Sequence, residues 1–190
     1  MKWIKFITEY VKSPRSIGAI VPSSRRLADE MVGDVDFQNA KCIVEYGAGT
    51  GVFTEKLIAR KKEDTILIIF ENNQEFYSEL LGTYKYKKNI YIINDGAENI
   101  KKYLRNLGVE QVDYIVSGLP FVSLPKSISD DILSNTSNIL NTNGEFITFQ
   151  YSLVKKNLFK NYFENIKVKK VVLNLPPAYV LKCRLGLKAR

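Results

Sequence analysis

The sequence predicts an α/β fold with one mostly parallel, seven-stranded sheet that carries helices on both faces. Short apolar runs alternate with helical patterns, which is typical of parallel strands joined by crossover helices. Runs such as Ile66–Phe70 are apolar throughout, as strands covered on both faces are. The last two runs flank a Leu-Pro-Pro-Ala turn and predict an antiparallel C-terminal hairpin. A length of 190 residues allows one such domain.

The apolar runs and their polar flanks give the expected boundaries. The strands are expected at Cys42–Tyr46, Thr65–Glu71, Ile90–Asn94, Val112–Ser117, Glu145–Tyr151, Val168–Leu173 and Tyr179–Leu185. The helices are expected at Val52–Ala59, Gln74–Leu81, Glu98–Leu107, Ser127–Leu140 and Leu153–Phe163. We expect a single domain over 1–190, in which residues 37–190 form the catalytic core and 1–36 a helical extension.

The extension begins with an amphipathic pattern at residues 2–12, which Ser13-Pro14 ends, since a residue before proline avoids the helical region. Ser23 or Ser24 is expected to cap a second helix that runs to Val32. A helix over 2–12 is too short to span a bilayer and suits the interface. We expect it to contact an anionic membrane surface through nearby Lys and Arg and through its apolar side, Trp3, Phe6, Ile7 and Tyr10. The alternative is that this helix packs on the core.

The amino-acid composition limits the partners and the kinds of catalytic site that the chain can have. The net charge of +8 favours anionic partners, either nucleic acid or an acidic membrane surface. The chain has no histidine, so His-based triads and His-ligated metals are excluded, and no metal site is expected. Cys42 and Cys183 are expected to be reduced core residues. No apolar run reaches the roughly 18 to 20 residues of a spanning helix, and no secretory signal is evident, so we expect a cytoplasmic protein.

A glycine-rich turn follows the first expected strand, in the order Glu45-Tyr46-Gly47-Ala48-Gly49-Thr50-Gly51. Glycines let the backbone turn sharply and approach a ligand closely. Such a turn serves many nucleotide ligands, but a dinucleotide site normally lacks the acid, which would face pyrophosphate. The pattern resembles motif I of class I S-adenosylmethionine-dependent methyltransferases, in which the carboxylate side meets the cationic methionine portion of the cofactor.

Two further acids follow the next two strands. Glu71 stands 20 residues after Gly51, where an acid can accept hydrogen bonds from both ribose hydroxyls. By resemblance, Asp95 would bind the adenine amine; alternatively it only caps the next helix. The expected cofactor is S-adenosyl-L-methionine, and its expected binding residues are Glu45, Tyr46, Gly47, Ala48, Gly49, Gly51, Glu71, Asn72, Asp95, Gly96, Ala97 and Ser117.

The segment after the fourth strand reads Ser117-Gly118-Leu119-Pro120-Phe121. Enzymes that methylate base amines resemble one another in an Asn/Asp-x-Pro-Tyr/Phe motif here, whose side-chain oxygen positions the amine. Gly118 supplies no such oxygen; for a lipid amine we expect glycine to leave room. The expected catalytic residues are Gly118, Leu119, Pro120, Phe121 and Tyr179. Cation–π contacts to a methylated ammonium are expected from Tyr46, Phe121, Tyr151 and Tyr179.

Nearly the whole chain resembles the short bacterial phospholipid N-methyltransferases, which convert phosphatidylethanolamine toward phosphatidylcholine. The resemblance runs through residues 13–24, Glu45–Gly51, Ser117–Phe121 and Asn174-Leu175-Pro176-Pro177-Ala178. It implies a Rossmann-like class I methyltransferase fold, with a phospholipid substrate at the inner membrane face and no obligate protein partner. The alternatives are a related rRNA adenine N6-methyltransferase lacking the C-terminal helical domain, a small-molecule methyltransferase, or a silent cofactor-binding scaffold.

Overall fold

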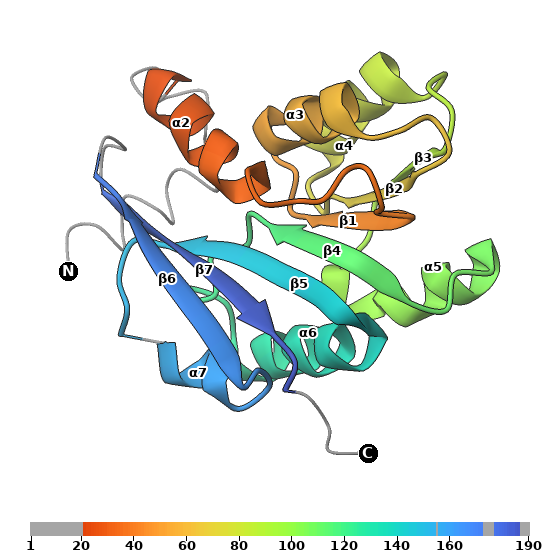
Figure 1. Ribbon diagram of the computed structural model, residues 1–190. Helices are drawn as coiled ribbons and strands as arrows, with labels where there is room; N and C mark the ends of the chain where they lie inside the picture. Colours follow the sequence, from red (N-terminus) through yellow and green to blue (C-terminus); the bar gives the residue numbers. More distant parts are fainter. Residues whose placement is uncertain (1–20, 155, 173–176, 187–190) are drawn as a thin grey trace.

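One seven-stranded sheet forms the centre of the computed structural model, which describes residues 21–154, 156–172 and 177–186 (Figure 1). The strand order is β3-β2-β1-β4-β5-β7-β6. β1 to β5 are parallel, and β7 lies antiparallel to both β5 and β6. The strands are β1 (Cys42–Tyr46), β2 (Ile66–Phe70), β3 (Ile90–Ile93), β4 (Val112–Ser117), β5 (Leu140–Gln150), β6 (Asn165–Val171) and β7 (Ala178–Arg184).

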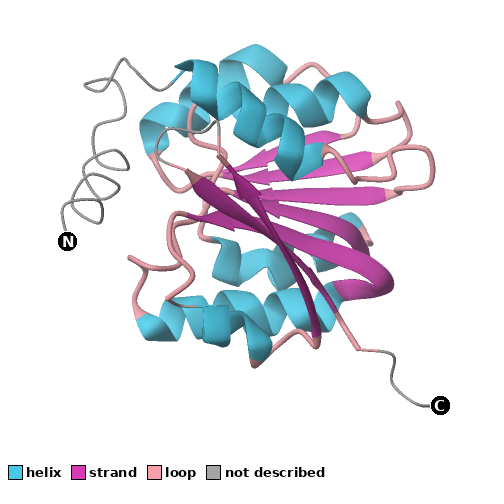
Figure 2. Ribbon diagram, turned by 60° about the vertical axis from the view of Figure 1, so that its left-hand side comes forward, coloured by secondary structure: helices cyan, strands magenta, loops and turns pink. Residues whose placement is uncertain are grey.

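Helices cover both faces of the sheet, which confirms the predicted fold class (Figure 2). On one face lie α2 (Val21–Val32), α3 (Val52–Arg60) and α4 (Gln74–Tyr84). On the other lie the 3-10 helix η2 (Ala97–Asn99), α5 (Ile100–Leu107), α6 (Lys126–Ile139) and α7 (Lys156–Lys160). Each face has its own apolar cluster, because alternate residues of a strand point to opposite faces.

Strand register brings the candidate site together. Tyr46 at the end of β1 pairs with Phe70 of β2 and with Ser117 of β4. These three strands therefore end level, and the segments that follow them lie at one edge of the sheet, the carboxyl edge. β6 also ends at this edge and β7 begins there, because β7 is antiparallel to its neighbours. Ligands of open α/β sheets bind outside this edge.

The helix before β1 differs from the expectation. α2 spans Val21–Val32, so Ser23 and Ser24 lie inside the helix and not at the position before its first residue. Pro22 is tolerated at its second position because the first helical turn has no internal acceptor for that missing N–H. Leu27, Met31 and Val32 are buried in the apolar cluster on the face that α2, α3 and α4 cover, so α2 is part of the domain core. The amphipathic segment 2–12 lies outside the described residues.

Three elements near the C-terminus also differ. β5 begins at Leu140 because Leu140 pairs with Val112, ahead of a register shift between Val112 and Tyr114. The helix expected at Leu153–Phe163 spans only Lys156–Lys160, and β6 begins at Asn165, three residues before the expected start at Val168.

Both cysteines are free and buried, as expected, and burial raises the pKa of the Cys42 thiol to about 12. Among the described helices, none is long and apolar enough to cross a membrane.

Candidate active site

The glycine-rich loop joins β1 to α3 in a conformation that requires glycine. Gly47, Gly49 and Gly51 have φ angles of +67°, +54° and +82°, in the left-handed region that side chains disfavour. The N–H groups of Gly47 and Ala48 donate to the Phe70 carbonyl at 2.8 and 3.3 Å, which ties the loop to β2. A Cβ atom at Gly49 would meet no heavy atom within 4 Å. The loop therefore presents backbone to an open side where a ligand can approach.

Glu71, at the end of β2, holds this loop in place. Its Oε2 accepts a 2.7 Å hydrogen bond from the Gly49 N–H, and its Oε1 accepts one of 2.7 Å from the Asn73 N–H. A carboxylate oxygen has two lone pairs, so each oxygen can accept one more donor, such as a ribose hydroxyl. Asn73, which the sequence analysis did not select, caps α4 by accepting from Glu75 N and Phe76 N. An asparagine directly before a helical pattern is the signal that identifies it.

Glu45 is fully buried beneath the loop and is only half satisfied. Its Oε2 accepts a 2.7 Å hydrogen bond from the Thr54 hydroxyl of α3, whereas its buried Oε1 has no partner among the described residues. Burial, helped by the nearby Glu71 charge, raises the pKa of Glu45 to about 8, although the Thr54 hydrogen bond opposes the shift. An unpartnered buried carboxylate oxygen is costly, so the site is suited to a cationic donor such as the amino group of a methionine moiety.

Asp95, after β3, organises the turn into α5. Its Oδ1 accepts from Gly96 N and from Asn99 Nδ2, each at 2.8 Å, and its Oδ2 accepts from the Tyr103 hydroxyl at 2.7 Å. The Tyr103 hydrogen bond is the main cause of its lowered pKa. The structure thus gives Asp95 a local ordering role, and its remaining lone pairs still allow contact with an adenine amine.

The segment after β4 packs directly on the glycine-rich loop. Gly118 N donates to Tyr46 O at 2.8 Å, and a Cβ atom at position 118 would lie 2.6 Å from the Gly47 carbonyl oxygen. A Cβ at Gly47 would in turn lie 2.7 Å from Leu119 Cδ2. Glycine at 118 is therefore required by the contact between two backbones. The sequence did not reveal this contact, and the expectation that glycine leaves room for the acceptor stays a prediction.

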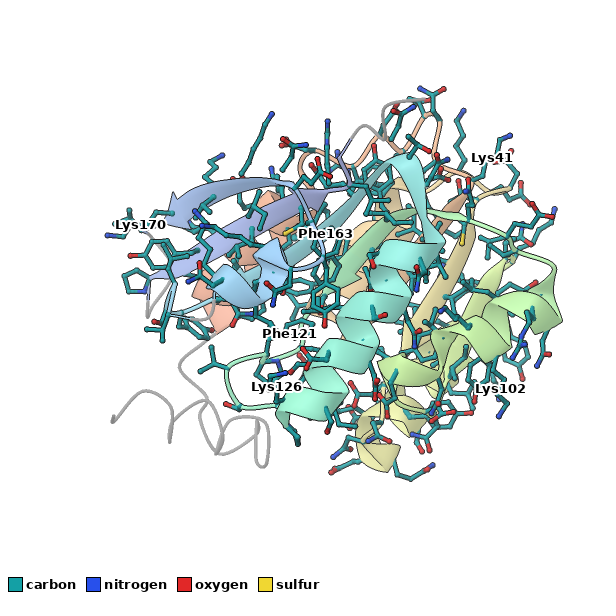
Figure 3. The ribbon with its side chains drawn as sticks, turned by 90° about the horizontal axis from the view of Figure 1, so that it is seen from below. Lys41, Lys102, Phe121, Lys126, Phe163 and Lys170 are labelled. Carbon is teal, nitrogen blue, oxygen red and sulfur yellow. The ribbon has the colours of Figure 1, made fainter. Side chains whose placement is uncertain are left out.

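Two of the four aromatic residues expected around the acceptor are core residues instead. Tyr46 is fully buried, and its hydroxyl shares a 3.3 Å hydrogen bond with Thr136 Oγ1 of α6. The Phe121 ring (labelled in Figure 3) is also fully buried. It lies edge-on to Phe159, with the ring centroids 5.3 Å apart. Neither ring lines an open cleft, because the apolar cluster on the face that α5, α6 and α7 cover encloses both. Ser117 is likewise buried, and its hydroxyl accepts from Leu119 N at 3.3 Å.

Tyr151 and Tyr179 remain as candidates at the carboxyl edge, because both are half-buried. The Tyr151 ring lies edge-on to that of Phe149, with centroids 5.4 Å apart. Tyr179 pairs with Gln150 of β5 and with Lys170 of β6. The Lys170 ammonium lies 6.0 Å from the Tyr179 ring centroid and projects at the end of β6 (Figure 3). The ring of Tyr179 is thus already in a position that attracts a cation.

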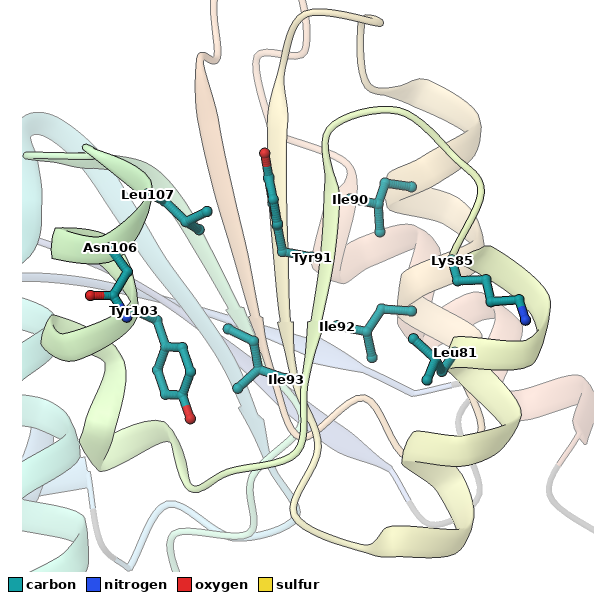
Figure 4. Close-up of a pocket in the computed structure, with 9 residues that line it drawn as sticks. All are labelled: Leu81, Lys85, Ile90, Tyr91, Ile92, Ile93, Tyr103, Asn106 and Leu107. Carbon is teal, nitrogen blue, oxygen red and sulfur yellow. The ribbon is translucent and has the colours of Figure 1, made fainter.

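A separate cavity of about 300 Å³ lies along the edge strand β3 (Figure 4). Ile90 and Ile92 face α4 across it, whereas Tyr91 and Ile93 face α5. Its lining residues are Leu81, Lys85, Ile90, Tyr91, Ile92, Ile93, Tyr103, Asn106 and Leu107. None of the expected cofactor or acceptor residues lines this cavity, so it is distinct from the candidate active site.

Comparison with known proteins identifies the family. No family model matches the chain. A curated protein of Singulisphaera acidiphila, an ornithine lipid N-methyltransferase, is 30% identical over 185 residues, which cover 96% of this chain and 95% of that protein. The chain belongs to this family of lipid N-methyltransferases. It is an S-adenosylmethionine-dependent methyltransferase, and the buried Glu45 carboxylate, the open side at Gly49 and the Glu71 carboxylate fit that cofactor.

Solved structures agree on the fold. An rRNA methylase of Streptococcus thermophilus has a TM-score of 0.57 at 18% identity, covering 90% of this chain and 99% of that one. A 16S rRNA methyltransferase of T. thermophilus, in complex with AdoMet and guanosine, has a TM-score of 0.62 at 17% identity, covering 90% and 45%. A precorrin-6y methyltransferase of Geobacter metallireducens has a TM-score of 0.62 at 12% identity, covering 85% and 86%. These likenesses show a Rossmann-like methyltransferase fold and do not confirm kinship with rRNA adenine dimethyltransferases.

Proposed function

We propose that this protein methylates the primary amine of a polar membrane lipid at the inner face of the membrane. The observation that carries the proposal is the match to an ornithine lipid N-methyltransferase along nearly the full length of both chains. The sequence motifs favour phosphatidylethanolamine as the acceptor, and the ornithine lipid N-methyltransferase relative makes an ornithine lipid a second candidate acceptor. Both acceptors present a primary amine close to an anionic group, a phosphate in one and a carboxylate in the other.

The three acids support a position for the cofactor. Glu45 would pair with the amino group of the methionine moiety, which gives its unpartnered Oε1 a donor. Glu71 would accept hydrogen bonds from the ribose hydroxyls while it still accepts one from the Gly49 N–H. Asp95 would accept a hydrogen bond from the adenine amine in addition to the one from Gly96 N. The neighbouring residues Asn72, Gly96 and Ala97 would line the cofactor site. Bound in this way, S-adenosylmethionine supplies an electrophilic methyl group on a sulfonium.

The acceptor would approach between Leu119-Pro120 and Tyr179. A lipid amine must shed a proton before it can attack, and closing the site against water favours the neutral amine. In the transfer the N–C bond forms as the S–C bond breaks, and the new ammonium loses its extra proton to water. The half-buried Tyr179 ring, which already faces the Lys170 ammonium, would hold the methylated headgroup by cation–π attraction of about 0.5 to 2 kcal/mol.

The N-terminal segment would add membrane affinity. Its apolar residues Trp3, Phe6, Ile7 and Tyr10 lie outside the described part of the chain, so their role rests on the sequence pattern. Deletion of residues 1–12 is expected to reduce flotation with anionic vesicles and to leave cofactor affinity nearly unchanged. If the truncated protein unfolds instead, the segment is a structural part of the domain.

Acceptor competition tests the proposal. The protein is incubated with methyl-labelled cofactor and with anionic vesicles that contain phosphatidylethanolamine, an ornithine lipid, both lipids or neither, and in parallel with ribosomal RNA. We expect label in the lipid fraction only when an amine lipid is present, and the mixed vesicles rank the two acceptors. Label in RNA with none in lipid would contradict the proposal and favour the rRNA methyltransferase alternative.

A further inference from the structure

Three exposed apolar side chains follow strands that end at the carboxyl edge, where the proposed acceptor site also lies. Leu153 and Val154 follow β5, and Val172 follows β6; their exposed fractions are 36%, 85% and 64%. Of the other large apolar side chains exposed in the described residues, Tyr86 lies just before β3 and Tyr91 lies within it, at the far side of the sheet. Exposed apolar residues that cluster around a site mark an interaction surface more often than scattered ones do.

Strand pairing sets the ends of β5 and β6, which these residues follow, at the same level. Gln150 at the end of β5 pairs with Tyr179, and Tyr179 pairs with Lys170 of β6. β5 and β6 are separated only by β7, so their ends lie about 10 Å apart. The β5 loop is also held in shape, since Val154 N donates to Ser152 Oγ at 3.3 Å and Lys156 N donates to Leu153 O at 2.9 Å. Val154 is therefore presented on a hydrogen-bonded turn.

Cationic side chains lie at the same edge as these three apolar residues. Lys170 is exposed at the end of β6, and Lys156 is half-exposed at the start of α7. α2 runs alongside α3 in the same direction, because Lys56 pairs with Asp29 and Arg60 donates to Val32 O at 3.2 Å. The start of α2 consequently lies at the carboxyl edge, as the start of α3 does. It places the exposed Arg25 and Arg26 at that edge too.

We propose that Leu153, Val154 and Val172 form a membrane-docking surface, which inserts into the lipid interface and turns the carboxyl edge toward the bilayer. Exposed apolar side chains with Arg and Lys at the same edge complement an anionic lipid surface, because burial of the apolar groups and attraction of the cations to the headgroups both favour membrane binding. A lipid amine has to reach this edge from the membrane, so docking here would deliver the headgroup to Leu119 and Tyr179. The inference deepens the proposed function, on which the headgroup delivery rests.

Paired acid substitutions test the docking surface. The variant Val154→Glu with Val172→Glu places two carboxylates on the surface, and Tyr86→Glu is the matched control, since Tyr86 is 89% exposed near β3. All forms should keep wild-type melting and cofactor affinity, because the changed side chains are exposed. We expect the double variant to bind phosphatidylglycerol-rich vesicles at least tenfold more weakly, and the control to bind like wild type. Equal vesicle binding by the double variant would overturn the proposal.

A fluorescence measurement tests insertion into the membrane without adding a negative charge to the surface. In a Trp3→Phe background, Val154→Trp should shift to the blue and be quenched by brominated lipids when vesicles are added, whereas Tyr86→Trp should not respond. A silent Val154→Trp would also overturn the proposal. So would a wild-type dimer that the double variant dissociates, because the surface would then bind a second copy. Insertion without methylation of any vesicle lipid would support docking while rejecting the proposed acceptor.

Discussion

The Gly49 N–H donates a 2.7 Å hydrogen bond to Oε2 of Glu71, which joins the two segments expected to hold the cofactor. The same carboxylate accepts the Asn73 N–H at the start of α4. Glu71 thus fixes the conformation of the glycine-rich loop without a ligand, and its remaining lone pairs can accept hydrogen bonds from the cofactor ribose. This relationship makes Glu71 both a binding residue and a positioning residue.

Glu71→Gln should weaken cofactor binding by about 10- to 100-fold, in line with about 1.5–3 kcal/mol for hydrogen bonds to a charged group. The amide nitrogen of glutamine cannot accept, so Gly49 or Asn73 loses its acceptor. Calorimetry measures the affinity, and faster amide exchange at Gly49 reports the loosened loop. Glu110→Gln removes the same charge from an exposed site before β4 and should change neither. A Glu71→Gln variant with wild-type affinity would contradict the assignment.

Glu45 should make both stability and cofactor binding depend on pH. Its folded pKa of about 8 lies above the ordinary value of 4.5, so its contribution to stability is full below about pH 4.5 and is lost as pH rises through about 8. Glu45→Gln should flatten this part of the profile of unfolding free energy against pH. Binding of a cationic amino group should lower the pKa of Glu45 and release a proton near neutral pH. Calorimetry in buffers of different ionisation enthalpy measures that release, and its absence would count against the pairing.

Gly118→Ala tests the contact between the two loops. The new Cβ would lie 2.6 Å from Gly47 O, so the variant should lose about 1–3 kcal/mol of stability and bind the cofactor more weakly. Gly82→Ala is the control: it lies within α4, where a Cβ meets nothing within 4 Å, and it should gain about 0.5–1 kcal/mol. Thermal melting and calorimetry on both variants give the comparison. Full stability in Gly118→Ala would show that the loops can separate freely.

Gly49→Val should abolish cofactor binding while the sheet still folds, because the side chain would enter the open side of the loop. Gly108→Val is matched to it. Gly108, at the end of α5, also has a positive φ, +67° against +54°, and a Cβ there also meets nothing within 4 Å. Both variants carry similar backbone strain, so only Gly49→Val should lose affinity. Similar losses of affinity in the two variants would mean that strain, and not the ligand site, explains the effect.

Much of the sheet could be predicted because its strands are continuous apolar runs with clear ends, as β1 and β4 are. The start of β5 could not, since the polar stretch after Leu140 becomes a strand only through tertiary pairing with Val112. The three acids could be selected from the sequence because each lies at or after the end of an expected strand, and because the first belongs to a pattern that resembles methyltransferase motif I. Thr54 and the reason for Gly118 could not be predicted, because each depends on a neighbour brought close by folding: the Glu45 carboxylate and the Gly47 carbonyl.

Mass spectrometry of vesicle lipids after turnover detects methylation of a lipid amine without any label. Anionic vesicles carrying phosphatidylethanolamine and an ornithine lipid are incubated with S-adenosylmethionine and either the wild-type protein or Glu45→Gln. We expect the headgroup amine of at least one lipid to gain methyl groups with the wild-type protein, and to gain them at least tenfold more slowly with the variant at subsaturating cofactor. Unmodified lipid amines after prolonged incubation with folded, cofactor-binding wild-type protein would contradict it.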